Sequence, residues 1–238
     1  MLAGVLLASP AGAGPVVLPD GSLEFLYSIN GGEDPLGNNP DPLGPKPWLK
    51  ALISEVKLGS EGNETSAVDI TLTTSLGPGG FAKEWAFNLK PELLNEFTRD
   101  QFTFECKFTG NDVCSGMTDS SYVWDPNNVR VPNGWSGFDL AFLLPTAKAK
   151  RLSDGTTLTL RMMREGGITP AAFNFFVTGD PLGEYTAVHV GGIGEGSRYS
   201  TTLLDDPPAS APMPLPVLGA LAAFSAGRRL RRRLAAAP

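Results

Sequence analysis

The sequence predicts an all-β fold, an antiparallel β-sandwich in which one side of each strand is packed and the other faces water. Three observations support this prediction. Short segments that alternate apolar and polar residues recur along the chain, Gly-, Pro-, Asn- and Asp-rich turns separate them, and few segments have helical periodicity. The pattern does not distinguish a jelly-roll from an immunoglobulin-like topology. A short apolar helix is expected near the C-terminus.

The expected elements follow in order along the chain. Strands are predicted at 22–29, 48–57, 66–75, 83–89, 101–108, 136–144, 156–163, 184–190 and 198–204. A single helical turn is expected at 91–95. Thr169 is the expected N-cap of a short helix that begins at Pro170. The segment 148–155 is predicted to turn the chain.

A long irregular loop is expected at 30–47, which is dense in Gly, Pro, Asn and Asp. Its acids Glu33, Asp34 and Asp41 are candidate Ca²⁺ ligands in an extracellular protein. Their spacing fits no recognised calcium loop, so a solvated loop without a cofactor is the favoured interpretation.

Two cysteines, Cys106 and Cys114, lie on either side of a Gly-Asn-Asp turn. An exported chain meets an oxidising compartment, so we expect a disulfide that closes the tip of a hairpin. Two free thiols are the alternative. A metal site is not expected, because the chain has no other cysteine and a single histidine.

The N-terminus and the charge balance indicate export. Residues 1–13 are apolar and end in Ala-Gly-Ala, as expected before a signal-peptidase cleavage site. The usual positively charged region is missing, so 1–13 is interpreted as a signal-peptide remnant. Of the 19 Lys and Arg residues five lie in the tail, which leaves 14 against 25 Asp and Glu and a net charge of −11 for the rest of the chain. Such a surface repels nucleic acid and anionic polymers and favours cations or neutral glycans.

The C-terminal segment 212–238 combines prolines, an apolar run and an arginine cluster. The run 215–226 would form a helix about 18 Å long, too short to cross a hydrocarbon core about 30 Å thick. The arginines that follow are the expected stop-transfer signal and should remain cytoplasmic: Arg228, Arg229, Arg231, Arg232 and Arg233. We therefore expect the tail to tether an exported chain to the membrane. The prolines of 205–211 predict an extended linker.

This tail resembles the C-terminal sorting signal of PEP-CTERM proteins, the substrates of bacterial exosortases, in its cyanobacterial-like variant. The matching segments are PLPVLGA at 214–220, AAF at 222–224 and the arginine cluster. The family's Pro-Glu-Pro is replaced here by Pro-Met-Pro, and the expected sorting motif is Pro212, Met213, Pro214, Leu215 and Pro216. The resemblance implies an exosortase-like processing enzyme as a partner and a secreted protein retained at the cell surface.

The middle of the chain resembles a recurring ectodomain of the same family. The matching segments are PWLKA at 47–51, WAFNLKPEL at 85–93, SGFDLAFLLP at 136–145, ITPAAFNF at 168–175 and YTAVHVGGIG at 185–194. The expected organisation is a signal remnant at 1–13, a β-sandwich ectodomain at 14–204, a linker at 205–211 and the sorting signal at 212–238. The resemblance implies no enzymatic activity.

Three further features are candidate sites of chemistry. His189 has no G-x-S-x-G segment to accompany it, so a structural hydrogen bond to a neighbouring loop is expected rather than a catalytic triad. The glycine-rich segment 191–196 lacks the lysine and the helix of a phosphate-binding loop and is interpreted as a turn. Asp139 is expected on the wet face of an edge strand, with a cation ligand as the alternative.

Trp124 and Trp135 lie in the polar, turn-rich stretch 119–137. Exposed indole rings there would stack on sugars, whereas buried ones would serve packing, and packing is favoured. The leading hypothesis is a non-enzymatic surface or extracellular-matrix protein, associated by resemblance with exopolysaccharide or biofilm. A carbohydrate-binding module that uses these tryptophans is the alternative, and a secreted hydrolase is the weaker one.

Overall fold

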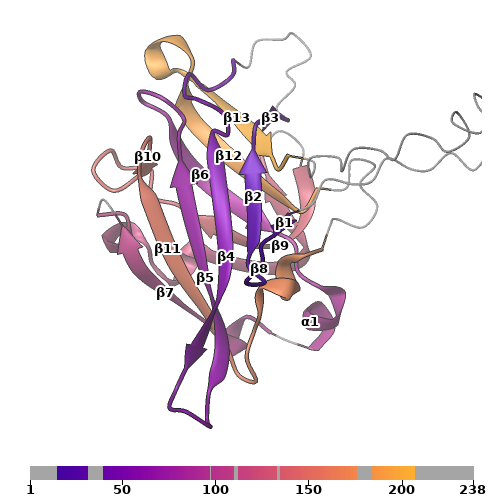
Figure 1. The fold of residues 1–238 in the computed structure, drawn as a ribbon. Coiled ribbons are helices and arrows are strands. Elements are labelled where there is room, and N and C mark those ends of the chain that lie inside the picture. Colours follow the sequence, from indigo (N-terminus) through magenta and orange to yellow (C-terminus); the bar gives the residue numbers. More distant parts are fainter. Residues whose placement is uncertain are drawn as a thin grey trace, which may run out of the picture. The chain divides into compact units, whose positions relative to one another are not determined.

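Two antiparallel sheets pack face to face and confirm the predicted β-sandwich (Figure 1). This computed structural model describes residues 15–31, 40–96, 98–109, 112–132, 135–175 and 184–206. The signal remnant, the sorting motif, the expected apolar helix and the arginine cluster lie outside the described residues. Within the described part, no helix has the length and apolar character needed to cross a membrane.

The two sheets have six and seven strands. Sheet A has the spatial order β1 (Val16–Val17), β2 (Leu23–Tyr27), β4 (Leu49–Leu58), β5 (Thr65–Thr74), β11 (Thr157–Arg164) and β7 (Phe102–Thr109). Sheet B has the order β3 (Ile29–Asn30), β13 (Tyr199–Leu204), β12 (Thr186–Ile193), β6 (Phe81–Phe87), β9 (Trp135–Leu143) and β8 (Tyr122–Val131), and β10 (Leu152–Ser153) pairs with β6. The helical turn predicted at 91–95 is α1 (Pro91–Glu96), and Thr169 precedes a 3-10 turn, Pro170–Phe173.

The polar, turn-rich stretch 119–137, where a strand is predicted only from 136 onward, contains all of β8 and the start of β9. The register between β8 and β9 is irregular from Trp124 to Val129, where the polar residues of 125–128 intervene. That bulge breaks the alternation by which a strand is recognised in a sequence. Pro126 is tolerated because β8 is an edge strand, where a missing backbone donor costs no ladder hydrogen bond.

The segment predicted as one strand at 22–29 is two strands, because the chain leaves sheet A for sheet B at Ser28. The carboxylate of Asp206 accepts hydrogen bonds from the Ser28 backbone N–H at 2.7 Å and from its hydroxyl at 2.6 Å. The neighbouring Asp205 is buried, and its Oδ1 accepts from the backbone N–H of Thr186 at 3.2 Å. Both aspartates were expected in the linker, but they are fixed to the sandwich.

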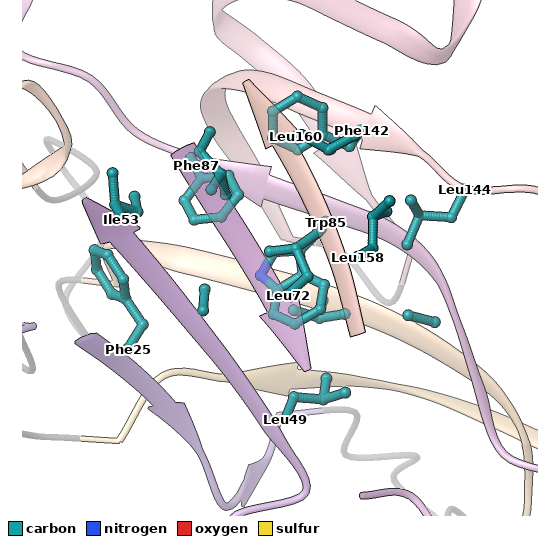
Figure 2. Packing of buried hydrophobic residues seen from close by; sticks show 14 of the residues in the cluster. Phe25, Leu49, Ile53, Leu72, Trp85, Phe87, Phe142, Leu144, Leu158 and Leu160 are labelled. Atoms are coloured by element: carbon teal, nitrogen blue, oxygen red, sulfur yellow. The ribbon is translucent and has the colours of Figure 1, made fainter. Parts of the chain in front are cut away.

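The core lies between the sheets and is rich in aromatic rings (Figure 2). Phe87 of β6 lies at its centre, in edge-to-face contact with Phe25, Phe142 and Phe173 at centroid distances of 6.1, 6.0 and 5.8 Å. Aromatic pairs of this geometry contribute about 0.5–1.5 kcal/mol beyond the area they bury. The three partners come from both sheets and from the 3-10 turn after β11, so this cluster connects segments that are distant in sequence.

One hydrogen-bonded group crosses the apolar core. Trp85 Nε1 donates to the hydroxyl of Tyr27 at 2.6 Å, and that hydroxyl lies 2.9 Å from Thr186 Oγ1. Both aromatic residues are fully buried. Burial raises the pKa of Tyr27 well above its usual value, because the phenolate would be desolvated. The group satisfies polar atoms of both sheets and fixes β2 relative to β6 and β12.

Replacing Tyr27 with Phe is expected to lower the free energy of unfolding by about 1–3 kcal/mol, since the indole N–H of Trp85 would lose its partner inside the core. Urea denaturation measures the change. Tyr199→Phe is the matched control, because Tyr199 is 43% exposed; equal unfolding midpoints for the two variants would contradict the role given to Tyr27.

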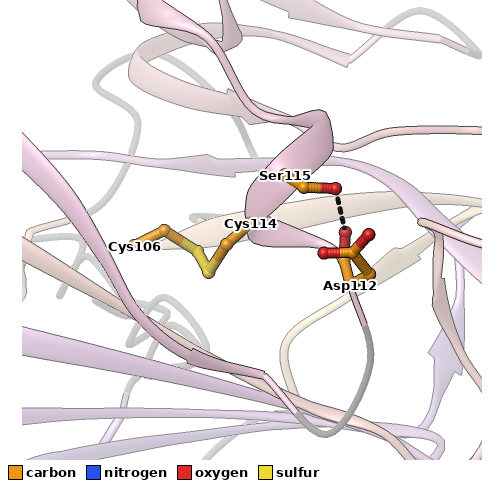
Figure 3. Close-up of a disulfide and its surroundings, with 4 residues drawn as sticks. All are labelled: Cys106, Asp112, Cys114 and Ser115. Atoms are coloured by element: carbon orange, nitrogen blue, oxygen red, sulfur yellow. Dashed lines mark hydrogen bonds between the residues drawn. A yellow bond between two sulfur atoms is a disulfide. The ribbon is translucent and has the colours of Figure 1, made fainter.

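The predicted disulfide between Cys106 and Cys114 is present (Figure 3). Cys106 lies in β7, whereas Cys114 lies in a 3-10 turn, Cys114–Gly116. In the same turn, Ser115 Oγ donates to the Asp112 carbonyl at 3.0 Å. The sequence predicts that this bond closes the tip of a two-stranded hairpin. In the structure it closes a loop at the end of β7 instead. The loop follows an edge strand, which the disulfide helps to hold in place.

Replacing both cysteines with serine is expected to lower the free energy of unfolding by roughly 2.5 kcal/mol, the chain-entropy value for a loop of about eight residues. Urea denaturation of the unreduced protein measures the loss. Ser115→Ala in the same turn is the control and should have a much smaller effect. A double variant as stable as the natural chain would show that the loop is ordered without the bond.

Candidate functional site

The two tryptophans proposed for glycan contact are half-buried and packed against the protein. The Trp124 ring lies against Phe102 with a centroid distance of 4.6 Å, at the margin of the core between the sheets. The Trp135 ring packs against a second cluster that includes Leu204, and its Nε1 donates to the Gly31 carbonyl at 3.2 Å. The two rings thus belong to separate clusters and do not form one binding surface.

Of the three candidate Ca²⁺ ligands, the structure describes only Asp41. Glu33 and Asp34 lie outside the described residues, and Asp41 accepts a hydrogen bond from the Asn30 amide at 3.2 Å. Among residues that the structure describes, no three His, Cys, Asp or Glu side chains gather in a way that would hold a metal ion.

The expectation that Asp139 lies on the wet face of an edge strand is wrong. Its strand, β9, lies between β6 and β8, and Asp139 is 2% exposed. The carboxylate accepts hydrogen bonds from the backbone N–H groups of Leu89 at 2.9 Å and Asn127 at 2.8 Å. Burial raises the pKa of Asp139, and these two bonds oppose the shift. Asp139 therefore stabilises the end of β6 and the β8 bulge.

The charged feature that the sequence did not reveal is a cleft of about 690 Å³ next to β6, β12 and β13. We call it the basic cleft. Its cations are Lys83 from β6, Lys148 and Arg151 from the segment between β9 and β10, and Arg198 from the turn before β13. Among the residues that the structure describes, no carboxylate lines the basic cleft. Four of the 14 basic residues outside the tail thus face one hollow in a chain that carries 25 acids.

Irregular strand pairing shapes this cleft. Ala82 pairs with Val190 and Glu84 with His189, so Lys83 is an extra residue in β6. A second irregularity in the pairing of β12 with β13 leaves Gly192 extra, at φ +68°. Bulges of this kind redirect side chains out of the regular alternation. Here they place the lysine side chain and a glycine backbone at one hollow.

Packing holds two of the cations in place. The guanidinium of Arg151 lies over the Phe81 ring at 4.5 Å, and Lys83 Nζ lies 5.7 Å from the centre of the same ring. A Cβ on Gly191 would lie 2.2 Å from Lys83 Cε, so the lysine chain crosses the strand where β12 has no side chain. These contacts orient both cations before any ligand is present.

His189 and Glu84 are cross-strand partners next to the Lys83 bulge, and burial shifts the pKa of each. Burial, with the charge of Lys83, lowers the pKa of His189 to about 4. The imidazole is therefore neutral near pH 7 and hydrogen-bonds to the backbone of Thr201, in a strand rather than the expected loop. Burial raises the pKa of Glu84 to about 7, so near pH 7 this carboxyl is ionised in only part of the molecules.

The glycine-rich segment 191–196, interpreted from sequence as a turn, includes the end of β12 and leads into β13. Gly192 and Ser197 line the basic cleft, although no helix of a phosphate-binding loop follows them. A smaller cavity of about 260 Å³ is lined by Lys90, Glu92 and Arg164 among others, and so mixes both signs of charge. Charge of one sign makes the basic cleft the candidate functional site.

Comparison with known proteins gives no relative from which a role could be transferred. No protein-family model matches the chain, and neither the curated proteins nor the solved structures provide a significant match.

Glu84→Gln is expected to be more stable than the natural chain at high pH, and the difference should grow as the pH rises. A carboxyl whose pKa is 4.5 in the unfolded chain and about 7 in the fold reduces stability progressively between these values, because the unfolded state loses its proton first. Urea midpoints of variant and natural chain should agree near pH 4, where Glu84 is largely protonated in both the folded and the unfolded state, and the variant should be the more stable near pH 8. Glu61→Gln in the exposed β4–β5 turn is the control; a constant difference for Glu84→Gln at both pH values would contradict the burial argument.

Proposed function

We propose that the protein is a non-enzymatic surface or extracellular-matrix protein, exported and retained by its C-terminal sorting signal. Its β-sandwich is the working part outside the cell, within an exopolysaccharide or biofilm matrix. An exosortase-like enzyme processes the tail, and the membrane holds the chain through that tail before processing.

The observation that carries this proposal is the disulfide between Cys106 and Cys114. Disulfides persist in oxidising compartments and are rare in the cytosol of mesophiles. The excess of acids over bases outside the tail also suits an exported domain, because it keeps the surface soluble. The packing of Trp124 and Trp135 against protein neighbours gives no support to the carbohydrate-binding alternative at those rings, and no observation favours the hydrolase.

Fractionation of cells that express the full chain tests the proposal. The protein is expected in the membrane, surface or extracellular fractions, with both cysteines protected from alkylation until a reductant is added. A chain that ends at Ala211 should be released into the medium, because it lacks the sorting motif and the arginines. Arg130→Gln, which removes an exposed charge outside the tail, is the control and should remain surface-retained.

A cytosolic protein with two free thiols would contradict export. Release of the natural chain and of the truncated chain to the same extent would contradict retention by the tail.

A further inference from the structure

The basic cleft concentrates positive charge that the described protein does not neutralise. Lys83, Lys148, Arg151 and Arg198 form no salt bridge with any described carboxylate. Cations held near one another repel, and an anion between them removes that repulsion. The composition of the cleft therefore points to an anionic ligand.

The cleft is a built site and not a chance gathering of flexible side chains. The β6 bulge and the bare strand at Gly191 position Lys83, while the Phe81 ring supports Arg151. The Nε atom of Arg151 is buried and has no hydrogen-bond partner within the described structure. Preorganised cations of this kind bind with a smaller loss of side-chain entropy.

The remaining lining indicates a sugar that carries a carboxylate. Arginine presents a planar fork of donors that matches a carboxylate. Ser197 and Ser200 add hydroxyl groups, and the ring of Tyr199, 43% exposed, is available for stacking on a sugar face. A volume of about 690 Å³ lies within the range of roughly 300–1,000 Å³ found for small-ligand pockets.

We propose that the basic cleft binds uronic-acid units of an acidic polysaccharide. Carboxylates of the sugar lie against Arg198 and Arg151, the charge of Lys83 completes the site, and Tyr199 packs on a ring. This assignment names a ligand for the surface or matrix protein proposed above, and it depends on that proposed function only for the source of the polysaccharide. Binding itself is a property of the folded domain and can be measured without export.

Calorimetric titration of the purified full chain with trigalacturonate tests the site, with maltotriose as the neutral sugar of equal length. We expect binding of the acidic trisaccharide, weakened by salt, and none of maltotriose. Arg198→Gln should weaken binding about 10- to 100-fold, the range for loss of a charged hydrogen bond. Arg130→Gln makes the same charge change at an exposed position outside the cleft and should bind as the natural chain does.

Gly191→Ala separates geometry from charge. The added Cβ must displace Lys83, but the net charge is unchanged, and Gly191 does not have the positive φ that would strain an alanine. We expect several-fold weaker binding of trigalacturonate with an unchanged urea midpoint.

Equal binding by the natural chain, Arg198→Gln and Gly191→Ala would overturn the site. Equal binding of maltotriose, or stronger competition by inorganic phosphate than by galacturonate, would overturn the sugar-acid assignment. If these titrations show no binding, the proposed export is still tested separately by fractionation. If the protein is cytosolic but binds trigalacturonate, the proposed export is rejected and the binding site is not.

Discussion

The pairing of β6 with β12 is the interaction on which both the core and the basic cleft depend. On the inner side, Trp85 pairs with Val188, and both side chains are fully buried between the sheets. The irregularity two residues away places Lys83 at the cleft. A regular ladder would strictly alternate side chains between the two faces, so the bulge allows one strand to serve the core and to present a cation. The cost is a local break in the backbone ladder, in the middle of a sheet where the flanking pairs hold the register.

Buried carboxyl groups reinforce this framework at the ends of strands. Asp139 and Asp205 are each 2% exposed, and both accept hydrogen bonds from backbone N–H groups. Burial raises the pKa of Asp205 to about 8, with a further contribution from the nearby Glu184. The Asp205 carboxyl therefore helps to hold the last strand on the sheet, although Asp205 is the first residue of the expected linker. These bonds, with those of Asp206 to Ser28, explain why contacts with the sandwich continue past Leu204, although the composition there changes to Asp and Pro.

Net charge is a poor guide to the local charge of this protein. A balance of −11 outside the tail suggested that anionic partners are repelled. The fold separates the charges, because it brings Lys83, Arg151 and Arg198 from three distant segments to one cleft. None of the described carboxylates lines that cleft. Acids elsewhere keep the surface soluble, while the cleft offers a local positive site for the carboxylates of the proposed uronic-acid ligand. The two properties are compatible because screening in salt restricts surface fields to about 10 Å.

The sequence by itself determined the fold class, nearly all the long strands and the Cys106–Cys114 pairing, because apolar–polar alternation and a short cysteine spacing are local properties. It failed at β8, where 125–128 interrupts the alternation, and at Asp139, whose burial depends on the backbone donors Leu89 and Asn127 supplied by other segments. Only the tertiary structure decided the strand order, the cross-sheet bond between Tyr27 and Trp85, and the basic cleft. Each of these requires contacts between residues far apart in the chain. The bulge that positions Lys83 arises from the pairing of β6 with β12, so it cannot be predicted from the sequence of either strand alone.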